Sequence, residues 1–338
     1  MTDIINICHG HAFDEIDMEA SYSYEEFCQP IKCALVDQPT TDTRCISIDS
    51  ETTNSIGVQS AHTIPDGYSD IFDDYDILPT ILGTGNFGCV RECLHRSTGE
   101  KCAVKTIEKC KVARLDHVRR EIQLLRSIDH SGIMKMVECY EDADYVHIVT
   151  ERYTGGELFD KIVDNTTDNG CLPEDQAVKI VKSLLEAVQH LHSKDIVHRD
   201  IKPENVLFES NEEGSSVKLI DFGLSRVHGL YDSDMTNQVG TAYYMSPDIL
   251  QGKYDRSCDL WAVGVVAYIL LCGYPPFNGD TEHDVQNSIR KGHFVFERNV
   301  WGNLSDSSRE FVSKLLCMDS SNIPSATEAL QHPWVRRA

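Results

Sequence analysis

The hydrophobic positions from Tyr75 onward change from the spacing of strands to the spacing of helices. Short apolar runs bounded by turn residues predict a strand that starts at Tyr75 and four more strands after it. One helix is expected between the third and fourth strands, because Val118, Ile122, Leu125 and Ile128 recur at intervals of three and four residues. The later strands are predicted at residues 90–94, 102–107, 133–140 and 145–150.

The second part of the pattern is mainly helical. Residues 157–159 open one predicted helix, and a later apolar stripe predicts a long amphipathic helix packed along one face. Residues 260–271 are apolar all round, which predicts a fully buried helix with Asp259 as its N-cap and the breakers of 273–277 at its end. The stripe consists of Ala177, Val181, Leu184, Val188 and Leu191.

Two polar stretches lie beside short strands predicted at 206–208 and 217–220. They are His198-Arg199-Asp200-Ile201-Lys202-Pro203-Glu204-Asn205 and Asp221-Phe222-Gly223. A carboxylate can orient a hydroxyl and accept its proton, an ammonium can balance the charge of a phosphoryl group, and a carboxamide oxygen is a hard metal ligand. The first stretch therefore combines the side chains that phosphoryl transfer needs.

A glycine-rich stretch, Leu82-Gly83-Thr84-Gly85-Asn86-Phe87-Gly88-Cys89-Val90, follows the first strand. Glycines let the backbone approach phosphates without a Cβ clash. Dinucleotide-binding folds use this spacing too, but they continue directly into a helix. Here a turn at 97–100 returns the chain into a strand that contains Lys105, so a hairpin is expected instead.

Together these motifs resemble a eukaryotic protein kinase. The resemblance implies an α+β, two-lobed kinase fold, with a small antiparallel β-sheet lobe plus one helix at 75–152 and a larger, mainly helical lobe at 153–334. Residues 1–74 are then an acidic, mostly disordered N-terminal tail, and 335–338 are a short C-terminal end. The tail reads either as a solvating leader or as a regulatory segment.

The resemblance also implies roles for single residues, with ATP and Mg²⁺ as cofactors. Asp200 would orient and deprotonate the substrate hydroxyl, Lys202 would stabilise the group in transfer, and Lys105, paired with Glu121, would grip the α- and β-phosphates. Asn205 and Asp221 would hold Mg²⁺. The nucleotide-binding residues would be Leu82, Gly83, Thr84, Gly85, Asn86, Phe87, Gly88, Cys89, Val90, Ala103, Lys105, Glu151, Tyr153, Glu157 and Leu207.

Within the superfamily the chain is most similar to the calcium/calmodulin-dependent group, particularly to calcium-dependent protein kinases, through 155–162, 221–225, 240–248 and 273–277. Residues 240–248 resemble the segment that docks substrates in Ser/Thr kinases and are called the docking segment below. Lys202 with Thr241 favours serine and threonine acceptors in protein substrates. In that group Glu157 and Glu204 help to recognise a basic residue N-terminal to the acceptor. The expected function is a Ser/Thr protein kinase. The alternative is a pseudokinase-type binding scaffold, which the intact set of catalytic residues disfavours.

Two features depart from the family pattern. Ser246-Pro247-Asp248 stands where kinases have Ala-Pro-Glu, and Ile323 stands where the arginine that pairs with that glutamate is expected. A lone buried carboxylate would cost roughly 3–5 kcal/mol, so Asp248 is expected to reach solvent. No EF-hand loop or basic amphipathic helix follows the catalytic region, so no calcium or calmodulin site is evident.

Composition and charge limit the classes of partner and the location that are expected. The formal net charge of −23 argues against a nucleic-acid partner, and residues 1–76 carry 16 acidic against 2 basic side chains. The thirteen cysteines form no Cys-x-x-Cys pair, and neither a signal peptide nor a transmembrane segment is visible. An intracellular, cytoplasmic location is therefore expected.

In the predicted activation segment, Asp232 and Asp234 supply negative charge and Thr236 is a candidate phosphosite, with no basis for choosing between them.

Overall fold

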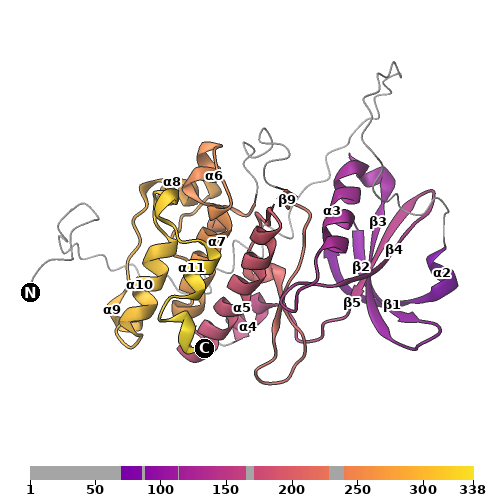
Figure 1. Ribbon diagram of the computed structural model, residues 1–338, viewed down its shortest axis with the longest axis horizontal. Helices are drawn as coiled ribbons and strands as arrows, with labels where there is room; N and C mark the ends of the chain where they lie inside the picture. Colours follow the sequence, from indigo (N-terminus) through magenta and orange to yellow (C-terminus); the bar gives the residue numbers. More distant parts are fainter. Residues whose placement is uncertain (1–69, 86–87, 113, 165–170, 228–239) are drawn as a thin grey trace, which may run out of the picture. The chain divides into compact units, whose positions relative to one another are not determined.

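Five antiparallel strands form one sheet in the order β1-β2-β3-β5-β4 (Figure 1). This computed structural model describes residues 70–85, 88–112, 114–164, 171–227 and 240–338, all within one unit, Ser50–Ala338. The predicted strands are confirmed with small shifts of their ends. They are β1 Tyr75–Gly85, β2 Gly88–His95, β3 Lys101–Glu108, β4 Met136–Glu141 and β5 Tyr145–Glu151.

Helix α3, Leu115–Ser127, runs beside this sheet, after the short 3-10 turn η1 at Lys109–Lys111 (Figure 1). Val118, Ile122 and Leu125 of the predicted stripe are buried. Ile128 is buried as well, although it lies one position beyond the helix as its C-cap. The stripe therefore fixes the side of α3 that packs inward, and Glu121 next to it faces inward too.

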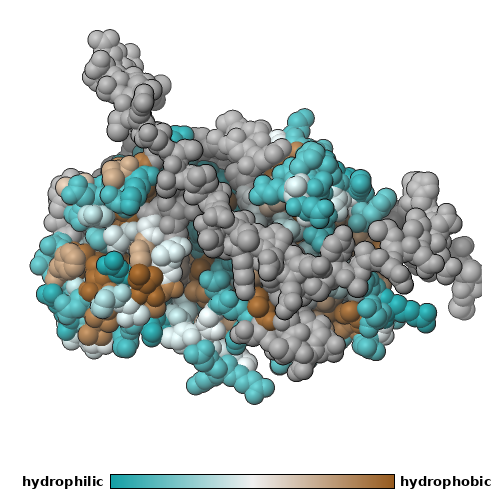
Figure 2. Space-filling model, turned by 180° about the vertical axis from the view of Figure 1, so that it is seen from behind, coloured by the Kyte–Doolittle hydropathy of each residue, from teal (hydrophilic) through white to brown (hydrophobic). Residues whose placement is uncertain are grey.

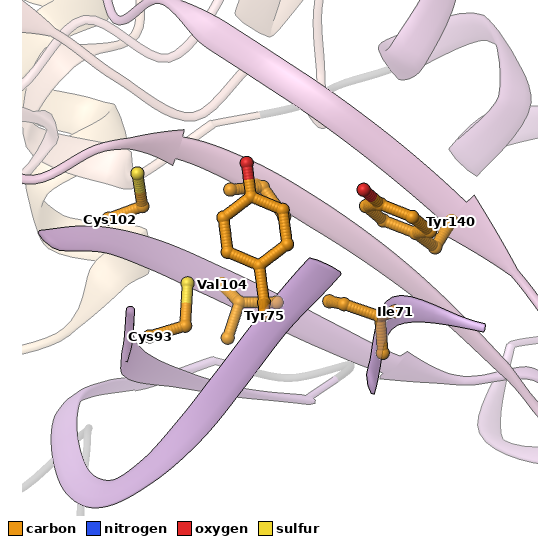
Figure 3. Packing of buried hydrophobic residues seen from close by; sticks show 7 residues of the cluster. Ile71, Tyr75, Cys93, Cys102, Val104 and Tyr140 are labelled. Atoms are coloured by element: carbon orange, nitrogen blue, oxygen red, sulfur yellow. The ribbon is translucent and has the colours of Figure 1, made fainter. Parts of the chain in front are cut away.

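A second apolar cluster involves a four-residue helix, α2, at Ile71–Asp74, which the sequence pattern did not predict. Ile71 packs with Tyr75 and with residues of neighbouring strands, as Figure 3 shows. The Asp70 side chain caps α2 by accepting from the Phe72 N–H at 3.0 Å. The strand residues of the cluster are Cys93, Cys102, Val104, Tyr140 and Val149.

The remaining part is mainly helical, which confirms the α+β prediction. The predicted amphipathic helix is α5, Glu174–Ser193, and it packs against α7, Ser257–Cys272, which is buried along almost its whole length. The other helices are α4 Leu158–Asp164, α6 Pro247–Gln251, α8 Glu282–Lys291, α9 Arg298–Trp301, α10 Asp306–Leu315 and α11 Ala326–Leu330, with 3-10 turns η3 Pro203–Asn205, η5 Ala242–Tyr244, η6 Ser320–Asn322 and η7 Val335–Arg337.

Two small two-stranded antiparallel sheets complete this part: β6 Ile196–Val197 with β9 Arg226–Val227, and the hairpin of β7 Val206–Phe208 with β8 Val217–Leu219. Strand β4 begins at Met136 rather than at the predicted Ile133. The reason is that Ile133 forms a bridge with Leu219, and the Met134 N–H donates to the Leu219 carbonyl at 2.9 Å. The chain before β4 thus joins the five-stranded sheet to the β7–β8 hairpin.

The surface carries hydrophobic side chains in small groups between hydrophilic ones (Figure 2). The largest exposed fractions among them are 66% for Val295 and 58% for Ile81, which belong to different parts of the chain. Within the ranges described, none of the helices combines the length and apolar character that a bilayer span requires.

Candidate active site

Asp259 holds the loop that contains Asp200. Its carboxylate is buried and accepts from the backbone N–H groups of His198 at 2.9 Å and Arg199 at 2.8 Å. Burial raises the pKa of Asp259, but His192, whose Nε2 lies 2.9 Å away, and the other donors outweigh burial and lower it. The predicted N-cap role is wrong, because α7 begins at Ser257 and Asp259 is its third residue. Its carboxylate instead ties the start of α7 to the backbone of the loop that contains Asp200.

Asp200 lies at the centre of a small hydrogen-bonded group. Asn205 Nδ2 donates to its Oδ2 at 2.9 Å and to its carbonyl at 2.8 Å. The Lys202 ammonium is 3.2 Å from the same Oδ2 and donates to the Thr241 hydroxyl at 3.0 Å. The Asp200 carboxylate is therefore oriented from both sides, and a fixed cation lies beside it.

The Asp221 segment packs directly against this loop. The Ile220 N–H donates to the Asn205 carbonyl at 2.9 Å, as the pairing of β7 with β8 requires. Phe222 is buried and meets the His198 ring edge to face, with ring centroids 4.9 Å apart. Asp221 itself is exposed and lies in the left-handed region with a φ of +62°, and its Oδ1 accepts from the Gly223 N–H at 3.1 Å.

Lys105 of β3 pairs with Glu121 of α3, with 3.1 Å between Nζ and Oε1. Burial lowers the pKa of the Lys105 ammonium, but the charges of Glu121 and Asp221 outweigh it and raise the pKa above its ordinary value. The ammonium therefore stays charged at neutral pH. A Cβ added to Gly223 would lie 3.1 Å from Asp221 Oδ1 and 3.9 Å from Glu121 Oε2, so the Asp221 carboxylate lies near the Lys105–Glu121 pair although Lys105 and Asp221 are 116 positions apart in the sequence.

The glycine-rich stretch joins β1 to β2. A Cβ added to Gly88 would lie 1.8 Å from the Thr106 carbonyl oxygen of β3, so only glycine fits there. A Cβ added to Gly83 would meet open space, which leaves its backbone free to approach a ligand. Of the other predicted residues here, Leu82 and Thr84 are exposed, Cys89 and Val90 are half-buried, and Asn86 and Phe87 fall outside the described residues.

The sheet faces this site with small side chains. Ala103 lies opposite Thr150, and Val90 lies opposite Lys105 in the strand pairing. Because side chains alternate along a strand, Ala103 and Lys105 share one face with Thr150. Thr150 is buried, so its small side chain forms part of this face.

The connection after β5 is held closely to the β7 strand. The Gly155 N–H donates to the Phe208 carbonyl at 3.0 Å, and a Cβ at Gly155 would lie 2.3 Å from the Ser210 carbonyl oxygen. Glu157 forms a bridge with Leu207, which places these two predicted nucleotide-binding residues side by side. At the start of this connection, the Tyr153 hydroxyl donates to the carboxylate of Glu151, the last residue of β5, at 3.2 Å.

Glu157 and Glu204 form an acidic pair near the catalytic loop. Burial raises the pKa of both carboxyls. The negative charge of Glu204 raises the pKa of Glu157 further, and the positive charge of Lys202 offsets these effects only in part. The Glu204 Oε2 atom is buried and has no hydrogen-bond partner within the protein. Two carboxylates whose charge is poorly compensated form a site that favours an incoming cation.

The segment expected to dock substrates ends at α6. Asp248 is half-buried and forms no ion pair with any residue that the structure describes, and Ile323 is half-buried as well. Ser246 caps α6 instead, because its hydroxyl accepts from the Ile249 N–H at 3.3 Å. Asp232, Asp234 and Thr236 lie outside the described residues.

One contact of the site was not anticipated from the sequence. The Tyr254 hydroxyl accepts from Arg199 Nη1 at 2.9 Å, and both side chains are buried. A single tyrosine between two helices carries no motif, so only the fold reveals this partner.

Comparison with known proteins agrees with this geometry. A family model described as "Protein kinase domain" matches residues 78–335. The chain therefore belongs to the protein kinase family, with the kinase fold predicted from the sequence.

Among curated proteins, the chain is similar to several calcium-dependent protein kinases. It is 39% identical over 268 residues to calcium-dependent protein kinase 5 of Plasmodium falciparum, covering 79% of this chain and 46% of that protein. It is 41% identical over 260 residues to calcium-dependent protein kinase 4 of the same species, covering 76% and 48%. For calcium-dependent protein kinase 3 of Plasmodium yoelii yoelii the identity is 38% over 265 residues, covering 78% and 48%. The chain thus spans about half the length of these relatives.

Proposed function

We propose that this chain is a serine/threonine protein kinase that transfers the γ-phosphoryl group of ATP to hydroxyls of protein substrates. One observation carries the proposal. The Asp200 carboxylate is held by Asn205 on a loop that is hydrogen-bonded to the Asp221 segment, and Asp221 Oδ1 and Glu121 Oε2, from the Lys105–Glu121 pair, both lie within 4 Å of a Cβ placed at Gly223. A base, a phosphate-binding cation and two metal ligands therefore converge from distant parts of the sequence.

The residues fit Mg²⁺ and ATP as cofactors. Asn205 uses its amide hydrogens on Asp200, which leaves its side-chain oxygen for a cation, and the Asp221 carboxylate is exposed. Mg²⁺ typically takes one or two protein carboxylates and completes its shell with water and phosphate oxygens. When bound, ATP supplies the phosphoryl group and Mg²⁺ neutralises its oxygens.

The protein's own part in the reaction follows from the contacts. Asp200 accepts a hydrogen bond from the substrate hydroxyl and takes its proton as the oxygen attacks. Lys202, held between Asp200 and Thr241, keeps a positive charge beside the path of the phosphoryl group. Lys105 stays charged beside Glu121 and orients the phosphates that do not react.

Substrate choice is assigned to the acidic pair. Glu157 and Glu204 would receive an arginine or lysine N-terminal to the acceptor, because a cation satisfies the unpartnered Glu204 oxygen and relieves the repulsion between the carboxylates. The proposed substrates are therefore peptides of the Arg-x-x-Ser/Thr kind.

The test is a phosphotransfer assay on the purified chain with radiolabelled ATP and Mg²⁺. An Arg-x-x-Ser peptide is compared with peptides in which alanine replaces the arginine or the serine, each with and without added calcium. Labelling of the arginine peptide alone is the expected result. The samples with added calcium test whether the activity of this chain depends on calcium, as the names of its relatives state for those proteins. No labelling of any peptide would contradict the proposed activity.

Asp200→Asn is the matched variant for this assay. Asparagine keeps the shape of the side chain and cannot take a proton, so kcat should fall by about 10²- to 10⁴-fold. The ATP-induced rise in melting temperature should persist, because Asp200 is not assigned to the nucleotide. Retained turnover would remove Asp200 from the role of base.

A binding scaffold is the second candidate, and the unpaired Asp248 at the end of the docking segment gives it some support. The two candidates separate in the same experiment. A scaffold would show ATP-induced stabilisation, or none, without any transfer to peptide.

A further inference from the structure

The buried side chain of Arg199 joins three segments of the site. Its Nε donates to the carbonyl of Leu224 at 2.6 Å, directly after Asp221-Phe222-Gly223. Its Nη1 donates to the hydroxyl of Tyr254 at 2.9 Å. Because Arg199 immediately precedes Asp200, this guanidinium connects the metal-binding segment, the catalytic loop and the chain that leads from α6 to α7.

Tyr254 is suited to hold a buried charge. It is 8% exposed, and its ring is enclosed while its hydroxyl points at Arg199. Burial raises the pKa of the Tyr254 hydroxyl, and the nearby Arg199 charge offsets this only in part. The hydroxyl therefore stays protonated and offers its lone pairs to the guanidinium. A hydrogen bond to a charged group is worth more than one between neutral groups.

The backbone at Arg199 needs such support. Its φ of +70° lies in the left-handed region, which a long side chain adopts only when its surroundings enforce it. Asp259 fixes the N–H of this residue, and Leu224 with Tyr254 fixes its side chain. If the guanidinium is released, the backbone at Arg199 can relax, and the Asp200 carboxylate moves with it.

The contact also anchors the docking segment. Tyr254 follows α6 by three residues, and α6 ends at Gln251 with Gly252 in the left-handed conformation. Asp248 pairs with no described residue, in keeping with Ile323 at the position where the family pattern has an arginine. Gly240, at the other end of the segment, packs against the Arg199 carbonyl oxygen, which would lie 3.1 Å from an added Cβ. Arg199 is thus contacted by Gly240 at the start of this segment and by Tyr254 beyond the helix α6 in which the segment ends.

We propose that Tyr254 is a positioning residue for phosphoryl transfer: its hydroxyl fixes the Arg199 guanidinium and, through it, the Asp200 carboxylate and the docking segment. The inference rests on the proposed kinase function. A displacement of about 1 Å in a catalytic group can cost roughly 10²-fold in rate, so a contact that does not touch substrate can still be decisive.

The test compares Tyr254→Phe with Tyr268→Phe. Both replace a buried tyrosine and delete one hydroxyl; that of Tyr268 donates to the Val295 carbonyl at 2.6 Å, in the aromatic cluster of the helical part. Tyr254→Phe should lower kcat by about 10- to 100-fold with little change in the KM for ATP. Tyr268→Phe should lower the melting temperature and leave kcat, per folded enzyme, unchanged.

A double-mutant cycle with Arg199→Met decides whether Tyr254 acts through the guanidinium. Residual activity is followed with radiolabelled ATP in the two single variants and the double variant. The expected result is that Tyr254→Phe has no further effect once the guanidinium is gone. An unchanged kcat in Tyr254→Phe, or an equal loss in both backgrounds, overturns the inference. An inactive wild-type chain would instead overturn the proposed function, and this inference with it.

Discussion

The carboxyls of Glu157 and Glu204 show how the surroundings of single residues set the behaviour of the site. Each is a common residue type whose burial disfavours ionisation and whose nearest cation, Lys202, already pairs with Asp200. A substrate cation would supply the missing charge. The sequence named these two residues through a family resemblance, but the physical reason for their role, incomplete charge compensation, is visible only in the fold.

This leads to a pH prediction. Because the pKa values of Glu157 and Glu204 are raised, these carboxyls gain protons at a higher pH than ordinary glutamates do. A neutral carboxyl does not attract a guanidinium, so the KM for an Arg-x-x-Ser peptide should rise as the pH falls from neutral. The rise should be absent for the alanine peptide and in the Glu157→Gln/Glu204→Gln variant. A pH-independent ratio of the two KM values would argue against the acidic pair as the arginine site.

A second prediction at this scale concerns Thr150. Its side chain shares a face with Ala103 and Lys105, and it limits the depth of the proposed nucleotide pocket. Thr150→Met should weaken bulky ATP-competitive inhibitors by about tenfold or more, because overfilling a packed site costs 1–3 kcal/mol. The KM for ATP, measured alongside, should change little. Equal inhibition of variant and wild type would mean that inhibitors do not reach behind Thr150.

At the scale of elements, α7 does more than fill the core. Its apolar length was predictable, because a helix that is hydrophobic all round has to be buried. What the pattern could not reveal is that Asp259, the third residue, projects its carboxylate onto the backbone of His198 and Arg199. A carboxylate near a helix start is an N-cap by default, and only the neighbouring loop shows that it serves a different segment.

Asp259→Asn tests this contact. Asparagine has one acceptor oxygen where aspartate uses two, and it cannot carry charge opposite His192, so the free energy of unfolding should fall by about 3–5 kcal/mol. Since the pKa of Asp259 is lowered, its stabilising effect is present above the ordinary carboxyl pKa and is lost as pH falls through the lowered value. Urea unfolding should therefore separate wild type from variant at neutral pH and bring them together in acid. A constant difference would exclude an ionic contribution.

Strand β4 illustrates a different limit of pattern reading. Residues 133–140 have the hydrophobic character of one strand, yet the first of them pair with Leu219 instead of the five-stranded sheet. A short apolar run indicates that a segment is buried and extended. It does not state which partner satisfies its backbone, because that depends on contacts that are distant in sequence.

At the scale of the molecule, α2 is part of the folded domain, because it packs against the five-stranded sheet. The sequence-based boundary places residues 1–74 in a tail, and most of them lie outside the described residues. Ile71, however, is 2% exposed and packs among Tyr75, Tyr140 and strand residues (Figure 3). A four-residue helix is too short to show a hydrophobic periodicity in the sequence. Its place in the folded part is therefore visible only from the burial of Ile71 in the structure.

Two truncations test where the folded part begins. A chain that lacks 1–69 keeps α2, whereas one that lacks 1–74 loses Ile71 and exposes the cluster on that face of the sheet. The second should melt at a lower temperature than the first, and Ile71→Ala in the full chain should cost about 2–5 kcal/mol. Differential scanning calorimetry compares the three. Identical melting of both truncations would place the boundary at Tyr75, as the sequence suggested.

The sequence by itself determined the succession of the five strands, the helix between the third and fourth of them, the burial of α5 and α7, and the residue types available for chemistry. These depend on local spacing and composition, which one chain displays directly. Only the tertiary structure decided that Lys105 meets Glu121 and Asp221, that Asp259 serves the catalytic loop, and that Tyr254 holds Arg199. These contacts join residues far apart in the chain, and their energies depend on distance and burial, which no local pattern encodes.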